Sequence, residues 1–143
     1  MLPQARNKDS KRRAVTLLLW IALIVIVTVP WYDLSNEPRW RAVAWLPFVS
    51  RPWNLLDVLL NFALYVPFGY WLLRQGTGAG SAWKVVAAAL LLSAAAETSQ
   101  VFSHRRIPSM TDLVTNAAGA WAGTRWARSR LSRRTDPLDP SSP

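Results

Sequence analysis

The chain has 143 residues, a formal net charge of +9, and hydrophobic side chains at 51% of its positions. It contains no cysteine and one histidine, a composition that excludes disulfides and thiolate metal sites, so we expect no metal and no cofactor. Its basic residues flank long apolar segments and do not alternate with exposed aromatic side chains. We therefore expect membrane helices and no nucleic-acid partner.

The first segment begins with a basic stretch. Residues 1–13 carry five basic side chains and one acidic side chain, and they lead directly into an apolar run over residues 14–31. This pattern predicts a basic cytoplasmic N-terminus followed by a first transmembrane helix. A secretory signal peptide is the alternative, but the run is long, and its end, VTVPW, lacks the small residues of a cleavage site. Nothing in the run is more polar than Thr16 and Thr28, so we expect this helix to act as scaffold.

Residues 31–54 mix tryptophan, proline and both charge signs without a regular period. Such a composition predicts a loop that lies partly among the lipid headgroups. We expect Trp40 and Trp45 to anchor the loop in this zone, and stacking on a substrate is the alternative role for these two side chains.

A second predicted span covers residues 55–73, and it carries polar side chains on one face. Asp57, Asn61 and Tyr65 recur every four residues, which places them on the same side of a helix. Pro67 lacks a backbone N–H group and predicts a kink, which either serves helix packing or acts as a gating hinge.

The third predicted span, residues 82–102, follows a short glycine-rich turn and is mostly alanine, leucine and valine. Near its end, Glu97 and Gln100 are three residues apart and so share a face. Small residues stand beside them at Ala89, Ser93 and Ala96, a stripe that suits close contact between membrane helices.

The fourth predicted span, residues 110–127, is the least hydrophobic of the four, and it follows a basic loop. Asp112 and Asn116 share one face with Gly119 and Gly123, which form a GxxxG pair and predict a close helix approach. The remaining residues, 128–143, are basic and end in DPLDPSSP, so we expect a disordered cytoplasmic tail.

The distribution of lysine and arginine gives the orientation. Twelve of these residues fall in the N-terminus, the 74–84 turn and the segment from Arg125 onward, and five fall in the 31–54 and 103–109 loops. By the positive-inside rule both termini are cytoplasmic. The sequence thus predicts an all-α membrane protein with four transmembrane helices, located as a multi-pass protein in the bacterial inner (cytoplasmic) membrane.

The polar residues of the three later spans are expected at similar depths. Because a helix rises about 1.5 Å per residue, Asn61 and Asn116 lie roughly 9 Å, and Glu97 roughly 7 Å, below the outer ends of their helices. We therefore expect a pocket that opens toward the extracytoplasmic face, with acidic walls and a basic rim. Glu97 and Asp112 are the candidate acid–base pair, and the candidate ligand-binding residues are Arg105, Arg106, Asn61, Gln100, Asn116 and Asp57.

A structural explanation competes with the pocket. Polar groups can simply hydrogen-bond between membrane helices, each bond contributing about 0.6–2 kcal/mol. Two carboxylates are a costly means of joining helices unless Arg105 or Arg106 pairs with them. His104 could act as a base or contact a phosphate, although a lone histidine in a loop is usually solvated.

Three motifs resemble those of the VanZ-like family of small integral membrane proteins. They are DVLLNFALYVPFG, ETSQ and RIPSMTDLVTNAAG, with the matching polar, proline and glycine positions at Asp57, Asn61, Pro67, Gly69, Glu97, Gln100, Arg106, Ser109, Asp112, Asn116 and Gly119. The motifs lie within residues 55–124, and we assign residues 14–127 to a VanZ-like membrane domain. The resemblance implies a four-helix cell-envelope protein; teicoplanin resistance is attached to the founding member of the family, for which no reaction is established.

The sequence is consistent with two functions. In the first, the pocket binds or modifies an anionic envelope lipid, with a phosphate-bearing headgroup, or a glycopeptide-related target. In the second, the protein is a non-enzymatic accessory subunit whose polar cluster packs helices or binds a membrane-protein partner. Whether the chain is an enzyme stays open with them.

Overall fold

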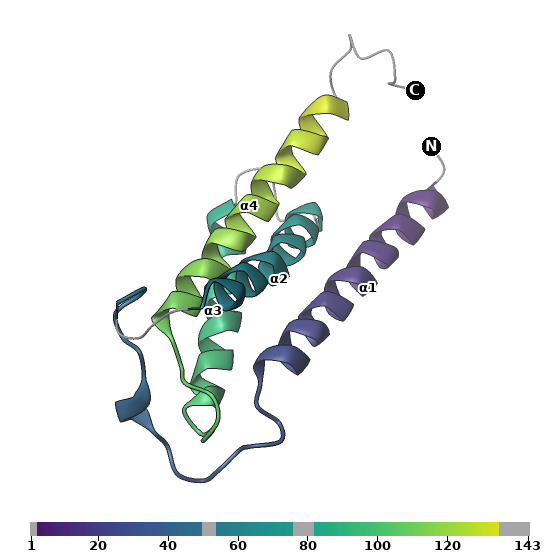
Figure 1. The fold of residues 1–143 in the computed structure, drawn as a ribbon. Helices are drawn as coiled ribbons and strands as arrows, with labels where there is room; N and C mark the ends of the chain where they lie inside the picture. The colour runs from purple at the N-terminus through teal and green to yellow at the C-terminus, as the bar shows by residue number, and fades with distance from the viewer. Residues whose placement is uncertain (1–2, 50–53, 76–81, 135–143) are drawn as a thin grey trace.

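The computed structural model describes residues 3–49, 54–75 and 82–134, and this part of the chain is helical (Figure 1). The helices are α1 (Pro3–Thr28), α2 (Leu55–Arg74), α3 (Ala82–Gln100) and α4 (Met110–Arg134), with a short 3₁₀ turn, η1 (Trp40–Ala42), between α1 and α2. Within the described residues, extended pairing is limited to isolated bridges between loops. The predicted all-α class and the four helical segments are confirmed.

Two of the helices, α2 and α3, are long and apolar enough to cross a membrane, judged by length and composition. Elsewhere in the described residues, α1 and α4 do not reach that level of hydropathy over a full span. In α1 the apolar run starts only at Ala14, after several basic turns, and α4 carries Asp112 in its first turn and arginines toward its end. The helical content is thus as predicted, while the apolar character is concentrated in the two middle helices.

Several helix boundaries differ from those predicted. α1 begins at Pro3, within the N-terminal segment that we expected to precede the helix, and α2 is one residue longer than predicted. α1 ends at Thr28 and not at residue 31, because the residue before Pro30 is disfavoured in the helical conformation. α3 ends at Gln100, since the following residues turn into the loop. α4 continues to Arg134, so the first part of the tail that we expected to be disordered is helical. The rest of that tail and most of the glycine-rich turn lie outside the described residues.

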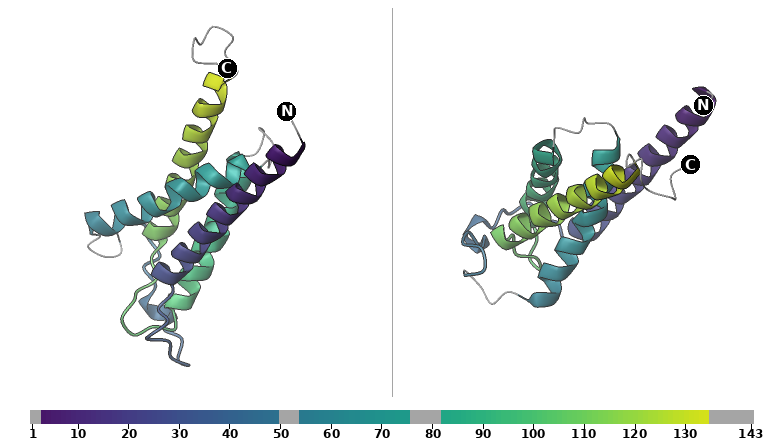
Figure 2. Two further views of the ribbon diagram at one scale, coloured as in Figure 1. Left: turned by 90° about the vertical axis from the view of Figure 1, so that its right-hand side faces the viewer. Right: turned by 90° about the horizontal axis from the view of Figure 1, so that it is seen from above.

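The helices form a bundle in which α2 runs obliquely across the other three (Figures 1 and 2). The start of α1 and the end of α4 lie at one end of this bundle (Figure 1). The loop after α1 and the loop between α3 and α4 lie at the opposite end. This arrangement brings the two loops, and the polar residues at the adjoining helix ends, together at the end of the bundle away from the termini.

Glycines allow α2 and α4 to cross at backbone distance. Gly119 faces the Phe62 carbonyl oxygen, Gly123 faces that of Val66, and Gly69 faces the backbone of Ala120. A Cβ atom added at any of the three glycines would collide with those backbone atoms. The close approach predicted from the GxxxG pair is therefore confirmed, and the partner of that pair is α2.

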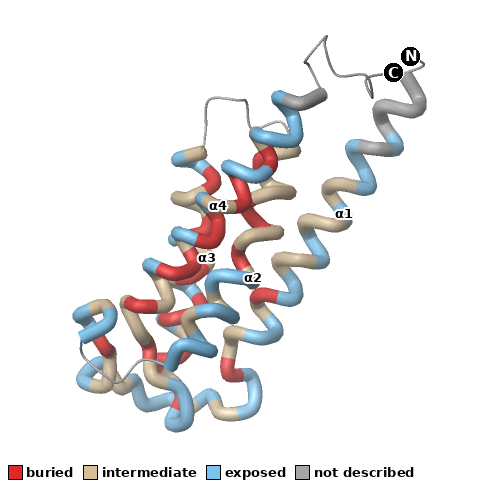
Figure 3. Tube along the Cα trace, turned by 45° about the horizontal axis from the view of Figure 1, so that its top comes forward, coloured by how far each residue is buried: buried red, intermediate tan, exposed pale blue. Residues whose placement is uncertain are grey.

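The buried core lies where α2, α3 and α4 meet, as the red segments of Figure 3 show. Tyr65 and Phe68 of α2 pack there with Ala89, Ala120 and Ile24. α1 contributes less: most of its described residues are half-buried or exposed, and its Trp20 Nε1 donates a 2.6 Å hydrogen bond to the Leu64 carbonyl. The many exposed leucines, isoleucines and valines of α1 and α2 form an apolar exterior of the kind that lipid covers.

Candidate functional site

The polar residues of α3 lie in a row along its buried face. Ser93, Glu97 and Gln100 are spaced by four and three residues, so they share the helix face that packs into the bundle, and all three are buried. Ala89 and Ala96 on the same side are small enough to let the neighbouring helices approach. The sequence pattern therefore places three polar side chains inside the bundle, where each needs a partner.

Glu97 on α3 and Asp112 on α4 bring their carboxyl groups into hydrogen-bonding contact. Glu97 Oε2 also accepts a 2.6 Å hydrogen bond from the backbone N–H of Ser109, at the start of α4. A hydrogen bond between two carboxyl groups needs a proton on one of them, because two ionised carboxylates offer no donor to each other. Arg106 is a basic side chain that interacts electrostatically with both carboxyl groups.

Amide side chains from two helices extend this cluster. Asn61 on α2 hydrogen-bonds the Asp112 carboxyl. Asn116, one turn further along α4, donates from Nδ2 to Ser93 Oγ at 2.8 Å, and its Oδ1 atom has no hydrogen-bond partner within the described residues. A buried acceptor without a donor is costly, so Asn116 is a place where a ligand or water would gain a hydrogen bond.

Gln100 ties the cluster to α1. Its Nε2 donates a 3.2 Å hydrogen bond to the carbonyl oxygen of Thr28, the last residue of α1. The helix that we expected to act only as scaffold therefore contributes a backbone acceptor beside the polar residues.

The loops at this end of the bundle are held together by Asp33 and Arg39. Asp33 Oδ2 accepts hydrogen bonds from Ser103 Oγ at 2.6 Å and from the Arg105 backbone N–H at 2.7 Å. Arg39 Nη1 donates to the carbonyl oxygens of Ser103 and His104 at 3.1 and 3.0 Å. The Ser103 hydroxyl, followed by the Arg105 N–H, lowers the pKa of Asp33 below its ordinary value.

These two loop residues were missed by the sequence reasoning. Asp33 bonds a residue 70 positions away, and Arg39 bonds one 64 positions away, so no local period marks either of them. The one available signal is that both charges stand in a loop rich in tryptophan and proline, which does not identify a partner. His104, by contrast, is exposed, in agreement with the solvated alternative for its side chain.

A cavity of about 560 Å³ lies at this end of the bundle. It is bordered by the ends of α1 and α3, the starts of α2 and α4, and the two loops. All eight residues proposed from the sequence line it: Asp57, Asn61, Glu97, Gln100, Arg105, Arg106, Asp112 and Asn116. Their convergence on one cavity is a finding, while the binding and catalytic roles assigned to them stay predictions.

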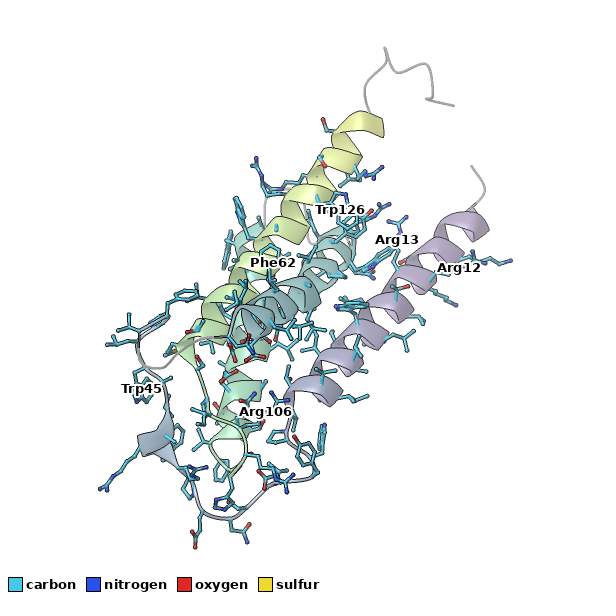
Figure 4. All side chains as sticks on the ribbon, viewed as in Figure 1. Arg12, Arg13, Trp45, Phe62, Arg106 and Trp126 are labelled. Carbon is cyan, nitrogen blue, oxygen red and sulfur yellow. The ribbon has the colours of Figure 1, made fainter. Side chains whose placement is uncertain are left out.

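The lining residues differ in exposure from the mouth of the cavity to its interior. Arg105, Arg106 and Asp57 are exposed, whereas Glu97 and Asn116 are buried, with exposed fractions of 9% and 3%. Figure 4 shows Arg106 at the end of the bundle opposite Arg12 and Arg13. The mouth of the cavity therefore carries two guanidinium groups and one carboxylate, and the interior contains hydrogen-bond acceptors.

A smaller apolar groove of about 140 Å³ adjoins the cavity and shares Glu97 and Ser109 with it. Trp40 and Trp45 line this groove, and both are more than half exposed, at 51% and 57%. Their position beside α3 and α4 is compatible with both roles considered for them, anchoring in lipid and contact with a ligand.

Comparison with protein-family models identifies the family of the chain. The family model described as VanZ/LLP1 matches residues 13–129. The chain belongs to the VanZ/LLP1 family. The resemblance seen in the three motifs is thereby confirmed, and the matched region includes every residue of the cavity. Searches among curated proteins and among solved structures found no match.

The chemistry open to this VanZ/LLP1 protein follows from its cavity. In the described part of the chain, no group of three or more histidine, cysteine, aspartate or glutamate residues is arranged to hold a metal ion. The Glu97–Asp112 pair can hold and transfer a proton, and the two guanidinium groups can bind an anion. The arrangement therefore suits binding of an anionic group, with proton transfer to or from it.

Proposed function

We propose that this VanZ/LLP1 protein is a multi-pass protein of the bacterial cytoplasmic membrane that binds the anionic phosphate headgroup of an envelope lipid in its polar cavity. In this arrangement the four helices cross the membrane with both termini in the cytoplasm, and the cavity opens toward the extracytoplasmic face. The common location of the start of α1 and the end of α4 supports an even number of crossings.

The observation that carries this proposal is the combination of charge and shape at the cavity. Arg105 and Arg106 stand exposed at its mouth, and the hydrogen bonds that hold them in the loop come from their backbone N–H groups. Their guanidinium groups are exposed at the mouth, and paired arginines suit the oxygens of a phosphate group.

The size and surroundings of the cavity favour a lipid headgroup as the source of that phosphate. A volume of about 560 Å³ is within the range typical of small-molecule sites. Val27, Val58 and Leu60 border the same cavity, and Leu60 is 59% exposed, so apolar surface continues from the cavity to the outside of the bundle. A lipid can place its headgroup in the cavity and its chains along this surface.

The carboxyl pair supports a step beyond binding. Glu97 and Asp112 are in contact inside the cavity. One of them can hold a proton and exchange it with a bound headgroup, which is the role of a general acid or base. A modified lipid, including one whose change affects a glycopeptide-related target, would be the product of such a step.

Purification into lipid nanodiscs, followed by mass spectrometry of the retained lipids, tests the proposal. We expect the wild type to retain a phosphate-bearing lipid, Arg106→Ala to lose it, and Arg41→Ala to keep it. Arg41 is the matched control, because it is an exposed arginine of the same loop end that does not line the cavity. A Glu97→Gln variant that binds the lipid but leaves it unmodified would identify the acid–base step.

The opposite result would favour the accessory-subunit function. If the same lipids remain with the wild type and with both arginine variants, while a membrane protein co-purifies and is lost on mutation of the cavity, the lipid site should be abandoned.

A further inference from the structure

The cavity has its strongest hydrogen-bond donors at the mouth and unpaired acceptors inside. At the mouth stand the guanidinium groups of Arg105 and Arg106, which can only donate, together with the exposed Asp57 carboxylate. Inside stand the Glu97–Asp112 pair and Asn116, whose available atoms are mainly acceptors. The carboxyl oxygens that are not engaged by the Ser109 N–H and the Asn61 amide remain to accept hydrogen bonds.

Asn116 gives this polarity its firmest support. Its side chain is 3% exposed, it lines the cavity, and its Nδ2 is already committed to Ser93 Oγ at 2.8 Å. What remains on the amide is Oδ1, an acceptor without a partner in the described part of the chain. Asn116 is also one helical turn, roughly 6 Å, further along α4 than Asp112, so it lies deeper than the carboxyl pair.

A ligand that carries only a phosphate would satisfy the mouth and leave the interior acceptors unpaired. Resting on the lipid site proposed above, we infer that the bound lipid is a phosphodiester whose headgroup ends in a hydrogen-bond donor, a hydroxyl or an ammonium N–H. In the bound state the phosphate lies at Arg105 and Arg106, and the donor reaches the carboxyl pair and Asn116 Oδ1.

This arrangement makes a specific distinction between headgroups of equal charge. An ammonium group with N–H bonds can donate to the interior acceptors, whereas a trimethylammonium group has the same charge and no donor. Likewise, a glycerol headgroup can donate from its hydroxyls, and a methyl ester of the same phosphate cannot. Sites built to hydrogen-bond a donor discriminate against analogues that leave buried groups unpaired.

The test uses nanodiscs that contain equimolar pairs of lipids with identical chains. One pair is phosphatidylethanolamine with phosphatidylcholine, and the other is phosphatidylglycerol with phosphatidylmethanol. Native mass spectrometry of the released protein measures which member of each pair stays bound. We expect the donor-bearing lipid to be preferred by about ten-fold in each pair.

Two variants assign the preference to the acceptor atom. Asn116→Leu removes Oδ1 at similar side-chain volume and should bring both preferences close to equal binding. Ser93→Ala breaks the same Asn116–Ser93 hydrogen bond but keeps Oδ1, so it should retain the preference. If Ser93→Ala loses it as fully as Asn116→Leu does, the effect is one of packing and the inference is wrong.

The inference and the proposed function fail in different ways. Equal binding of both members of each pair by the wild type, with loss of all four lipids in Arg106→Ala, would overturn the donor requirement and leave the lipid site standing. Retention of none of the four lipids by the wild type would overturn both.

Discussion

The backbone N–H of Ser109 donates a 2.6 Å hydrogen bond to Oε2 of Glu97, and this contact joins the start of α4 to the end of α3. Only the 101–109 loop separates the two helices in the chain. The bond holds the carboxyl group of Glu97, which also contacts Asp112 in the first turn of α4. The carboxyl pair, the loop and the start of α4 therefore act as one structural unit.

We expect Glu97 and Asp112 to act as a coupled pair in function. Glu97→Gln and Asp112→Asn should each abolish most lipid modification, and the double variant should lose little more, because either change disrupts the carboxyl pair. The three variants are compared by modified lipid per unit of inserted protein. Glu37→Gln, at an exposed acidic residue of the loop, serves as the control and should behave as the wild type.

Additive losses in that experiment would show that the two carboxyl groups act independently. A fall in the amount of inserted protein that matches the loss of lipid would instead assign the pair to helix packing.

The bundle and the cavity could be predicted from the sequence because their signals are local. Asp112 and Asn116 repeat at helical spacing, and Glu97 and Gln100 do the same, so each pair identifies a face without knowledge of the fold. The expectation that these helix faces meet in one pocket came from the similar depths estimated for their polar residues. The hydrogen bond between Gln100 and Thr28 could not be predicted, since a backbone carbonyl carries no sequence signal.

The loops were beyond prediction for a different reason. Asp33 and Arg39 form hydrogen bonds with the loop between α3 and α4, and only the folded structure brings that loop beside them. No pattern in the sequence predicted that α2 would cross the other helices obliquely. Gly119 and Gly123 predict a close approach, but only the structure identifies Phe62 and Val66 as the residues approached.

We expect Gly123→Ala to destabilise the crossing of α2 and α4. The added Cβ would collide with the Val66 carbonyl oxygen and force the helix backbones apart. Overpacking of this kind costs about 1–3 kcal/mol, so the free energy of unfolding in detergent titrations should fall by that order. Ala118→Leu, on an exposed position of α4, is the control, and an equal loss there would assign the effect to general disturbance of the helix.

The absence of cysteine from the sequence makes the proposed topology directly measurable. Single cysteines at Ser10, Glu37 and Arg130 all fall on exposed positions, the first and last near the termini and the second in the loop after α1. In intact cells a membrane-impermeant maleimide should label Glu37→Cys only, and permeabilised cells should show all three labelled. Labelling of Arg130→Cys from outside would leave α4 or another helix without a membrane crossing and would contradict the four-span arrangement.

Acid should loosen the loops through Asp33. Hydrogen bonds from Ser103 and Arg105 lower the pKa of this carboxyl in the folded protein, so its ionised form stabilises the fold. That stabilisation is complete above the ordinary aspartate pKa, about 3.9, and is lost as the pH falls through the lower value of the folded state. Hydrogen exchange of the Arg105 amide, corrected for the intrinsic rate, should show steady protection from neutral pH down to about pH 4 and a fall below it. In Asp33→Asn the protection should already be reduced at neutral pH and should change little with acid, whereas Glu37→Gln should follow the wild type. An acid-induced fall of the same size in Asp33→Asn would mean that another group controls the loop.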